Sequence, residues 1–409
     1  MTASISSREV RRALLLREEI ALLDLRHEAG FATGHPLFAA NLDVDRIDVE
    51  AEIRLPRKDA AIVLYDHGEG LVEKAAERLA ALGYSDVRAL DRGLSGWEEA
   101  GYELFQDVNS YAKAFGELVE ARRHTPSLAA EDVAALIEEK ADIAILDARR
   151  PDEYATMNIP GSFSAPGGEL VLRARAAAPD PDTTIIVNCA GRTRSIIGTQ
   201  SLINAGVPNR VVALRNGTIG WTLAGQTLQH GSDRHAPAGD AIEARTKARA
   251  VAYKAGVRHI APDDAASLAA DLTRTLYRFD VRSAEEYVAG HIAGFRHYPG
   301  GQLVQETDMA APVRGARILL ADDLGPRADM AASWLAQMGW EVYVLDGGFD
   351  GPLETGAGRT IPPTDRTHRY KRPYEGTDNA ATAMQAYLDW EFGLVDQLER
   401  DATHGFIVI

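Results

Sequence analysis

The chain has 409 residues, of which 45% are hydrophobic and 25% charged, a composition typical of globular proteins with room for two to four domains. Its net charge of −16 argues against nucleic acid or an anionic membrane as a partner, because the long-range field would repel both. The single cysteine excludes an intramolecular disulfide framework and fits a reducing compartment. Since the first twenty residues are rich in charge and no 18-residue apolar run occurs, we expect a cytoplasmic protein.

One pattern occurs three times along the chain. Each copy begins with an apolar run that ends in Asp-x-Arg, and a second apolar run follows it. The residue after the second run lies 42 positions beyond the Asp of the motif. The three pairs of positions are Asp24 and Asp66, Asp147 and Cys189, and Asp280 and Asp322. Three equal intervals predict three homologous domains.

The predicted elements alternate between strands and helices. After each second run the sequence predicts an amphipathic helix, over 72–82, 195–205 and 328–338, each ending near a glycine. A further strand follows at 87–90, 211–214 and 342–345. This alternation favours an α/β fold with a parallel sheet covered on both faces by helices.

The remaining segments predict the domain boundaries. We expect domains over 1–106, 125–230 and 259–353, and a linker helix over 107–124. The linker over 231–258 has a Gly/Pro/Asp-rich stretch at 231–239, followed by a helix-like run at 241–255. The C-terminal tail, 354–409, is too short for a fourth domain. Its apolar stripe between Ala380 and Arg400 predicts a helix that docks on this chain.

Cys189 is predicted to lie in a loop between the strand at 185–188 and a helix that begins at about Ser195. The loop also contains Ala190, Gly191, Arg192, Thr193 and Arg194. Free N–H groups and the dipole at a helix N-terminus favour an anion. We therefore expect the loop, with its two arginines, to lower the pKa of the Cys189 thiol and to bind an anionic substrate.

The order of short motifs resembles the rhodanese (sulfurtransferase) family. In the middle domain these motifs are Asp147-Ala-Arg149, Glu153-Tyr154, Ile159-Pro160-Gly161, Cys189 to Arg194, Asn216-Gly217 and Gly220-Trp221. The third domain matches through Asp280-Val-Arg282, Glu286-Tyr287 and Gly290-His291-Ile292, and the first matches more weakly. The resemblance implies three tandem domains, each with a five-stranded parallel sheet flanked by helices.

The resemblance also implies an activity. A sulfane sulfur would pass from an anionic donor such as thiosulfate to cyanide or a thiol, through a persulfide on Cys189. Asp66 and Asp322 stand at the equivalent positions and cannot form a persulfide, so the first and third domains are expected to be inactive. One departure is Met157-Asn158, where the family often has Gly-His.

The expected roles follow from these positions. Cys189 is the catalytic nucleophile, residues Ala190, Gly191, Arg192, Thr193, Arg194 and Ser195 bind substrate, and Asp147 and Arg149 form a supporting ion pair. Trp97 and Trp221 are expected in the core. We expect no cofactor and no metal, because the eleven histidines show no metal-ligand spacing. The partners are a small sulfur donor and acceptor, and a homodimer is left open.

Two other functions stay open on the sequence alone. A cysteine phosphatase or arsenate reductase also uses Cys and Arg around an oxyanion, but related phosphatases place five residues between them, and four separate Cys189 from Arg194. A regulatory scaffold is the second alternative, because two of the three nucleophile positions are lost.

Overall fold

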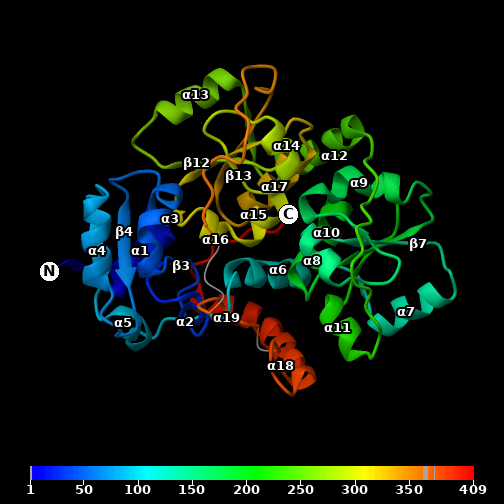
Figure 1. Ribbon diagram of the computed structural model, residues 1–409, viewed down its shortest axis with the longest axis horizontal. Helices are drawn as coiled ribbons and strands as arrows, with labels where there is room; N and C mark the ends of the chain where they lie inside the picture. Colours follow the sequence, from blue (N-terminus) through cyan, green and yellow to red (C-terminus); the bar gives the residue numbers. More distant parts are fainter. Residues whose placement is uncertain (1, 363–366, 373) are drawn as a thin grey trace.

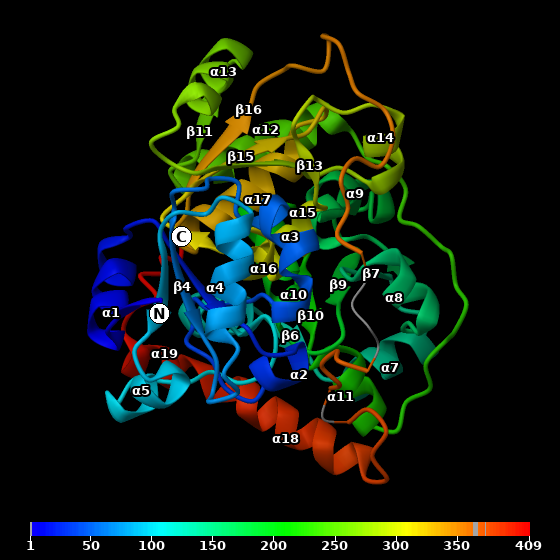
Figure 2. The same ribbon diagram turned by 60° about the vertical axis from the view of Figure 1, so that its left-hand side comes forward.

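The computed structural model describes residues 2–362, 367–372 and 374–409. It has three α/β lobes, coloured blue, green and yellow to orange in Figure 1, with helix α6 (Ser110–Arg123) running between them. The red C-terminal helices α18 (Ala380–Phe392) and α19 (Leu394–Asp401) pack along the underside of the first two lobes (Figure 2).

In the first domain every strand of the predicted sheet is parallel, in the order β1-β5-β4-β2-β3. The strands are β1 (Ala3–Ile5), β2 (Ile20–Asp24), β3 (Ala40–Asn41), β4 (Ala61–Tyr65) and β5 (Val87–Leu90). The helices are α1 (Ser7–Leu16), α2 (Glu28–Phe31), α3 (Ile47–Arg54), α4 (Val72–Ala81) and α5 (Gly93–Glu99), with the short 3-10 turn η1 (Val44–Arg46).

The second domain repeats this arrangement in the order β6-β10-β9-β7-β8, again with parallel strands. The strands are β6 (Ser127–Leu128), β7 (Ile143–Asp147), β8 (Phe163–Ser164), β9 (Thr184–Asn188) and β10 (Val211–Leu214). The helices are α7 (Ala130–Glu138), α8 (Pro151–Thr156), η2 (Gly167–Glu169), α9 (Leu170–Ala177), α10 (Thr193–Asn204) and α11 (Gly217–Leu223).

The third domain follows α12 (Ala241–Lys254) and has the order β11-β16-β15-β12-β13. Its strands are β11 (Arg258–Ile260), β12 (Leu276–Asp280), β13 (Arg296–His297), β14 (Val313–Arg314), β15 (Arg317–Ala321) and β16 (Glu341–Leu345). Its helices are α13 (Pro262–Ala270), α14 (Ala284–Ala289), α15 (Gly300–Gln305), α16 (Thr307–Ala310) and α17 (Pro326–Gln337).

The three predicted sheets are confirmed, and the first one gains a strand that the sequence did not predict. Strand β14 of the third domain pairs antiparallel with the edge of β2, with Val313 opposite Ala21. Buried side chains of the first and third domains form one continuous core, which includes Leu22, Phe279 and Trp334. These two domains therefore pack as one body, and the second domain closes against them through α6, α10 and α17.

The predicted docking helix is two helices, separated at Gly393. Leu394 and Leu398 of α19 are buried in the core shared by the first and third domains. Helix α18 packs on α6 and α11, beside the loop that follows β9. The tail therefore packs against this chain, as predicted, and it reaches the candidate site.

Candidate active site

Cys189 lies directly after β9, and its backbone is held by the loop that begins α11. Thr218 N donates to Cys189 O at 2.9 Å, and Ile219 N donates to Ala190 O at 3.0 Å. Gly217 makes this approach feasible, because it has a positive φ of 55° and a Cβ there would lie 2.4 Å from Cys189 O. The Asn-Gly motif thus fixes the path of the Cys189 loop.

The thiol of Cys189 is almost completely buried, with 2% of the side chain exposed. Its Sγ lies 3.4 Å from Ser195 Oγ, and that hydroxyl donates to Arg192 O at 2.8 Å. Burial raises the pKa of the thiol, against the opposing effects of Arg194 and of the hydrogen bonds with the side chain and backbone of Ser195. The expectation of a lowered pKa was wrong, because the thiol is buried more deeply than a loop cysteine beside two arginines suggested.

Arg192 faces helix α6 rather than solvent. Its Nε and Nη2 donate to the two carboxylate oxygens of Glu117 at 2.7 and 2.8 Å, and Nη2 also contacts Glu120. Its Nη1 donates to Asn216 Oδ1 at 3.0 Å, and the guanidinium lies 4.0 Å from the centre of the Phe392 ring. Arg192 therefore ties the Cys189 loop to α6 and α18.

Arg194 lies two residues further along and forms a two-point ion pair with Glu153 of α8. The N–O distances are 2.7 and 2.9 Å, and this pair lowers the pKa of Glu153 to about 2. Arg194 also lies on the wall of the cavity at Cys189. Helix α10 begins at Thr193, two residues before the predicted start, so Thr193 to Ser195 lie in its first turn.

Asp147 and Arg149 form the predicted ion pair at the end of β7. Arg149 Nε and Nη2 donate to the carboxylate at 2.9 and 2.7 Å, and Asn188 Nδ2 donates to it at 2.8 Å. The same pair recurs in the other domains, between Arg26 and Asp24 and between Arg282 and Asp280, which indicates a structural role.

The Met157-Asn158 departure leaves this local structure intact. Arg149 donates to Met157 O at 2.6 Å, just as Arg282 donates to Gly290 O. Asn158 Nδ2 donates to Tyr154 O, the bond that a ring nitrogen of His291 makes with Tyr287 O in the third domain. The amide of Asn158 therefore replaces an imidazole in a buried hydrogen bond.

A cavity of about 460 Å³ opens at Cys189, and its walls come from all three domains, from α6 and from the C-terminal tail. The Cys189 loop forms the floor, and Asp107 and Asn109 follow the first domain. Helices α6 and α18 add Lys113, Tyr387 and Glu391, and the tail before α18 adds Arg369, Tyr370, Arg372 and Tyr374. The tail residues were not among the predicted site residues, and the dense basic and aromatic segment from Arg369 to Tyr374 is the sequence signal that could have indicated them.

In the first and third domains a carboxylate fills the position of the thiol. Asp66 accepts hydrogen bonds from Gly68 N at 3.0 Å and Leu71 N at 2.6 Å. Asp322 accepts from Arg327 N at 2.9 Å and Ala328 N at 3.3 Å. The donors that an anionic substrate would need are thus occupied by the protein itself.

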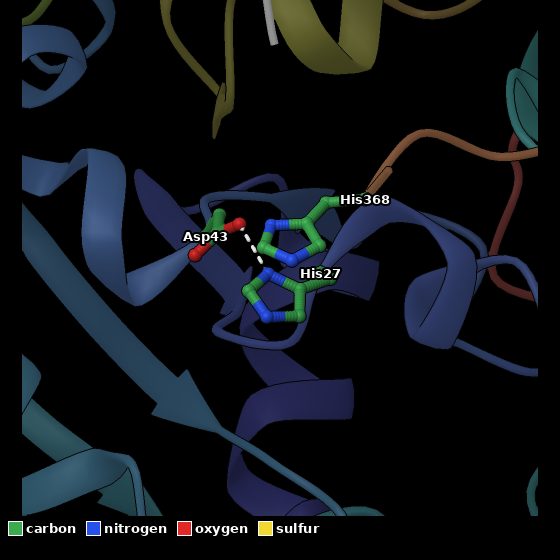
Figure 3. A group of neighbouring side chains, drawn as sticks. All are labelled: His27, Asp43 and His368. Carbon is green, nitrogen blue, oxygen red and sulfur yellow. Dashed lines mark hydrogen bonds and ion pairs between the residues drawn. The ribbon is translucent and has the colours of Figure 1, made fainter. Parts of the chain in front are cut away.

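Three possible metal ligands that do not line this cavity come together beside Glu28 and Arg369, which do. His27 Nδ1 lies 2.6 Å from Asp43 Oδ2, and the ring of His368 stacks on His27 at 3.9 Å (Figure 3). No sequence spacing predicts this group, because His368 belongs to the tail. The two rings are within 20° of parallel, and a metal lies in the plane of each imidazole that binds it, so this arrangement does not aim both rings at one ion.

Comparisons with known proteins agree with the fold and the motifs. A family model described as a rhodanese-like domain matches residues 8–100, 129–224 and 262–353.

Within the described part of the chain, every helix is too short or too polar to span a bilayer.

The crystal structure of a thiosulfate sulfurtransferase from Pseudomonas aeruginosa is 48% identical, with a TM-score of 0.93, and the match covers 100% of both chains. The thiosulfate sulfurtransferase GlpE of Ectopseudomonas mendocina (strain ymp) is 35% identical over 75 residues, which are 17% of this chain and 64% of that protein. The three family matches and the full-length similarity establish that this chain belongs to the rhodanese family, with three rhodanese-like domains in tandem.

Proposed function

We propose that the chain is a thiosulfate sulfurtransferase whose second domain carries the transferred sulfur as a persulfide on Cys189. The observation that carries this proposal is the position of the only thiol, which lines a cavity together with six cationic and four acidic side chains. The name of the Pseudomonas aeruginosa relative, which is similar over its whole length, supports the same activity.

The donor would bind through positive charge that the cavity supplies at its rim. Arg194 lies beside the loop, and Arg150, Arg372 and Lys113 line the same space, with Arg150 paired to Asp152 and Lys113 to Asp107. Arg194 remains paired with Glu153, so the additional cations are needed to offset the charge of a dianion such as thiosulfate. The Ser195 N–H and the first turn of α10 stabilise negative charge on sulfur.

The chemistry then takes two steps. The Cys189 thiolate attacks the outer sulfur of thiosulfate, and the S–S bond of the donor breaks with its electron pair leaving on sulfite. An acceptor, cyanide or a thiol, next attacks the outer sulfur of the persulfide, and the electron pair of the Sγ–S bond returns to Cys189. Each step breaks one S–S bond and forms one new bond to the transferred sulfur, an S–S bond with a thiol or a C–S bond with cyanide, so no redox cofactor is required.

The other loop residues divide into two roles under this proposal. Ala190, Gly191, Thr193, Arg194 and Ser195 face the donor, or hold the backbone that does. Arg192 is a positioning residue, because Glu117, Glu120 and Asn216 occupy its guanidinium. Asp147 and Arg149 support the loop from below through Asn188.

The first and third domains act as scaffold for the site in the second. The tail that covers Cys189 is anchored in the core that these two domains share, and the segment after the first domain adds Asp107 and Asn109 to the cavity wall. The first and third domains can lack a nucleophile in this role, because a scaffold needs only to pack and takes no part in the reaction.

The test is thiocyanate formation from thiosulfate and cyanide by the wild-type chain and by Cys189→Ser. We expect turnover only in the wild type, and incubation with thiosulfate alone should add the mass of one sulfur to the peptide that contains Cys189. Ile203→Ala, a substitution at an exposed position of the same helix away from the loop, serves as the matched control. Equal rates in wild type and Cys189→Ser would reject the proposal in favour of a scaffold function.

A further inference from the structure

Glu391 of α18 is a buried acid beside the Cys189 loop. Only 1% of the residue is exposed, and it lines the same cavity as the thiol. Its carboxylate lies directly over the loop, because a Cβ added at Gly191 would be 3.4 Å from Glu391 Oε2. Helix α18 is peculiar to the tail and has no counterpart within the three repeated domains.

The two oxygens of Glu391 differ in their surroundings. Oε1 accepts a hydrogen bond from Tyr387 Oη at 3.1 Å, whereas the buried Oε2 finds no hydrogen-bond partner among the residues that the structure describes. A buried carboxylate oxygen without a donor is costly, and such groups usually have a function or bind a group that comes and goes.

The charged neighbours of Glu391 are engaged elsewhere. Lys113 of α6 pairs with Asp107 at 3.0 Å, and Arg192 of the loop is bonded to Glu117, itself a buried acid that faces Glu391. Burial therefore outweighs the two cations and raises the pKa of Glu391 to about 7. The group can exchange a proton near neutral pH.

The Cys189 thiol needs such a group. Its burial raises the pKa, so in the resting state it holds a proton that must leave before sulfur can attack. Among the other cavity acids, Asp107 is paired with Lys113, Glu375 is paired with Arg369, and Glu28 accepts a hydrogen bond from Tyr370 N at 2.7 Å. Glu391 combines an unpaired oxygen with a place at the loop.

We propose that Glu391 is the general base that accepts the proton of the Cys189 thiol across the cavity and returns it at the end of each cycle. This inference rests on the proposed sulfurtransferase activity and extends it, since it names the group that activates the nucleophile.

Protons and electrons balance over the whole catalytic cycle. The Cys189 thiol gives its proton to the Glu391 carboxylate, and the thiolate takes the outer sulfur of thiosulfate, releasing sulfite with the electron pair of the broken S–S bond. Cyanide then removes that sulfur as thiocyanate, and the pair of the Sγ–S bond returns to Cys189 as a thiolate. The proton on Glu391 returns to the thiolate, so the net reaction converts thiosulfate and cyanide to sulfite and thiocyanate.

The first experiment needs no turnover. The rate of Cys189 alkylation by iodoacetamide is followed against pH in wild type, Glu391→Gln and Asp389→Asn, the last being an exposed acid of the same helix. We expect an inflection near pH 7 in wild type and Asp389→Asn, and its loss in Glu391→Gln. An unchanged inflection in Glu391→Gln would overturn the proposal.

The second experiment measures the burst of sulfite released in a single turnover. At pH 7 we expect Glu391→Gln to slow the burst about 100-fold, as loss of general-base catalysis does, with little change in the thiosulfate concentration that gives half the maximal rate. A burst as fast as that of wild type would overturn the proposal. If wild type gives no burst, the proposed function fails, while the alkylation profile still tests Glu391.

Tyr387→Phe provides a variant that keeps the carboxylate. Removing the Tyr387 hydroxyl takes away the hydrogen bond that lowers the pKa of Glu391, so the inflection should move to higher pH. An inflection that stays in place would show that another group titrates, which contradicts the assignment even if Glu391→Gln does not fold.

Discussion

Arg327 donates hydrogen bonds from Nε and Nη2 to Asp322 at 2.9 and 2.8 Å, and these two residues hold the positions of Arg194 and Cys189 in the second domain. It also bonds Glu286 at 2.6 Å, the equivalent of the bond between Arg194 and Glu153. The third domain thus keeps the arginine and its glutamate, and an aspartate replaces the thiol together with any anion that would bind there.

This relationship predicts that Asp322 stabilises the folded third domain. Asp322→Ala should lower the free energy of unfolding by about 3 kcal/mol, because it leaves buried N–H groups and part of the Arg327 charge without an acceptor. Urea denaturation measures the change, with the exposed Asp350→Ala as control. Thiocyanate formation at low temperature should persist, and a stability equal to wild type would contradict the prediction.

The ion pair between Arg194 and Glu153 predicts a pH-dependent contribution to stability. The pKa of Glu153 falls from 4.5 to about 2 on folding, so the stabilisation is complete above pH 4.5 and is lost as the pH falls to about 2. Glu153→Gln should be less stable than wild type by up to about 3 kcal/mol at pH 7, and the difference should vanish at pH 2.

Unfolding by urea at several pH values gives the comparison, with the exposed Asp152→Asn as the matched control. A difference between wild type and Glu153→Gln that stays constant from pH 7 to pH 2 would show that the pair does not cause it.

The ion pair between Arg192 and Glu117 predicts that these two residues contribute to stability in a coupled way. Arg192→Met should lower the free energy of unfolding by roughly 3–5 kcal/mol, since it leaves the buried Glu117 carboxylate unpaired. The double variant Arg192→Met, Glu117→Gln removes both charges and should recover much of that loss. Urea denaturation of the four chains completes the cycle, and additive losses would contradict the coupling.

The tail predicts an effect on donor affinity. Arg372 lines the cavity and lies 4.0 Å from Glu153, whereas its neighbour Lys371 is exposed and does not line it. Arg372→Ala should raise the KM for thiosulfate about tenfold with little change in kcat, because one charged contact to a bound anion is lost. Lys371→Ala should behave as wild type. Equal KM values in both variants would remove the tail from the donor site.

Much of the fold follows from the sequence because its signals are local and repeated. Buried parallel strands such as β9 are short apolar runs, and each main helix ends near a glycine, so three copies reinforce one another. Strand β14 could not be predicted from the sequence, because Val313 and Arg314 carry no periodic pattern. Their pairing with β2 depends on how two domains pack. The break between the two tail helices at Gly393 was not predicted, because one apolar stripe continues through both helices.

The site was predicted in part for the same reason. Cys189 and its loop are adjacent in the sequence, and the interval to Asp147 located them. The partners of Arg192 and the acid Glu391 come from α6 and α18, which lie about 75 and 200 residues away, and no spacing rule connects them. Burial of the thiol is also a tertiary property, so its raised pKa could not be obtained from neighbouring arginines.

Glu391 predicts a stability that falls as pH rises. Burial raises its folded pKa from 4.5 to about 7, so in this interval the folded chain keeps a proton that the unfolded chain releases. The ionised carboxylate thus destabilises the folded chain above pH 7, by about 3 kcal/mol if the whole shift is realised. Glu391→Gln has no charge to bury and should be more stable than wild type at pH 8, although it should be the poorer enzyme. Urea unfolding at pH 5 and pH 8 measures the difference, with Asp389→Asn as control. A Glu391→Gln chain that loses as much stability as wild type between these pH values would show that Glu391 is already ionised at pH 5.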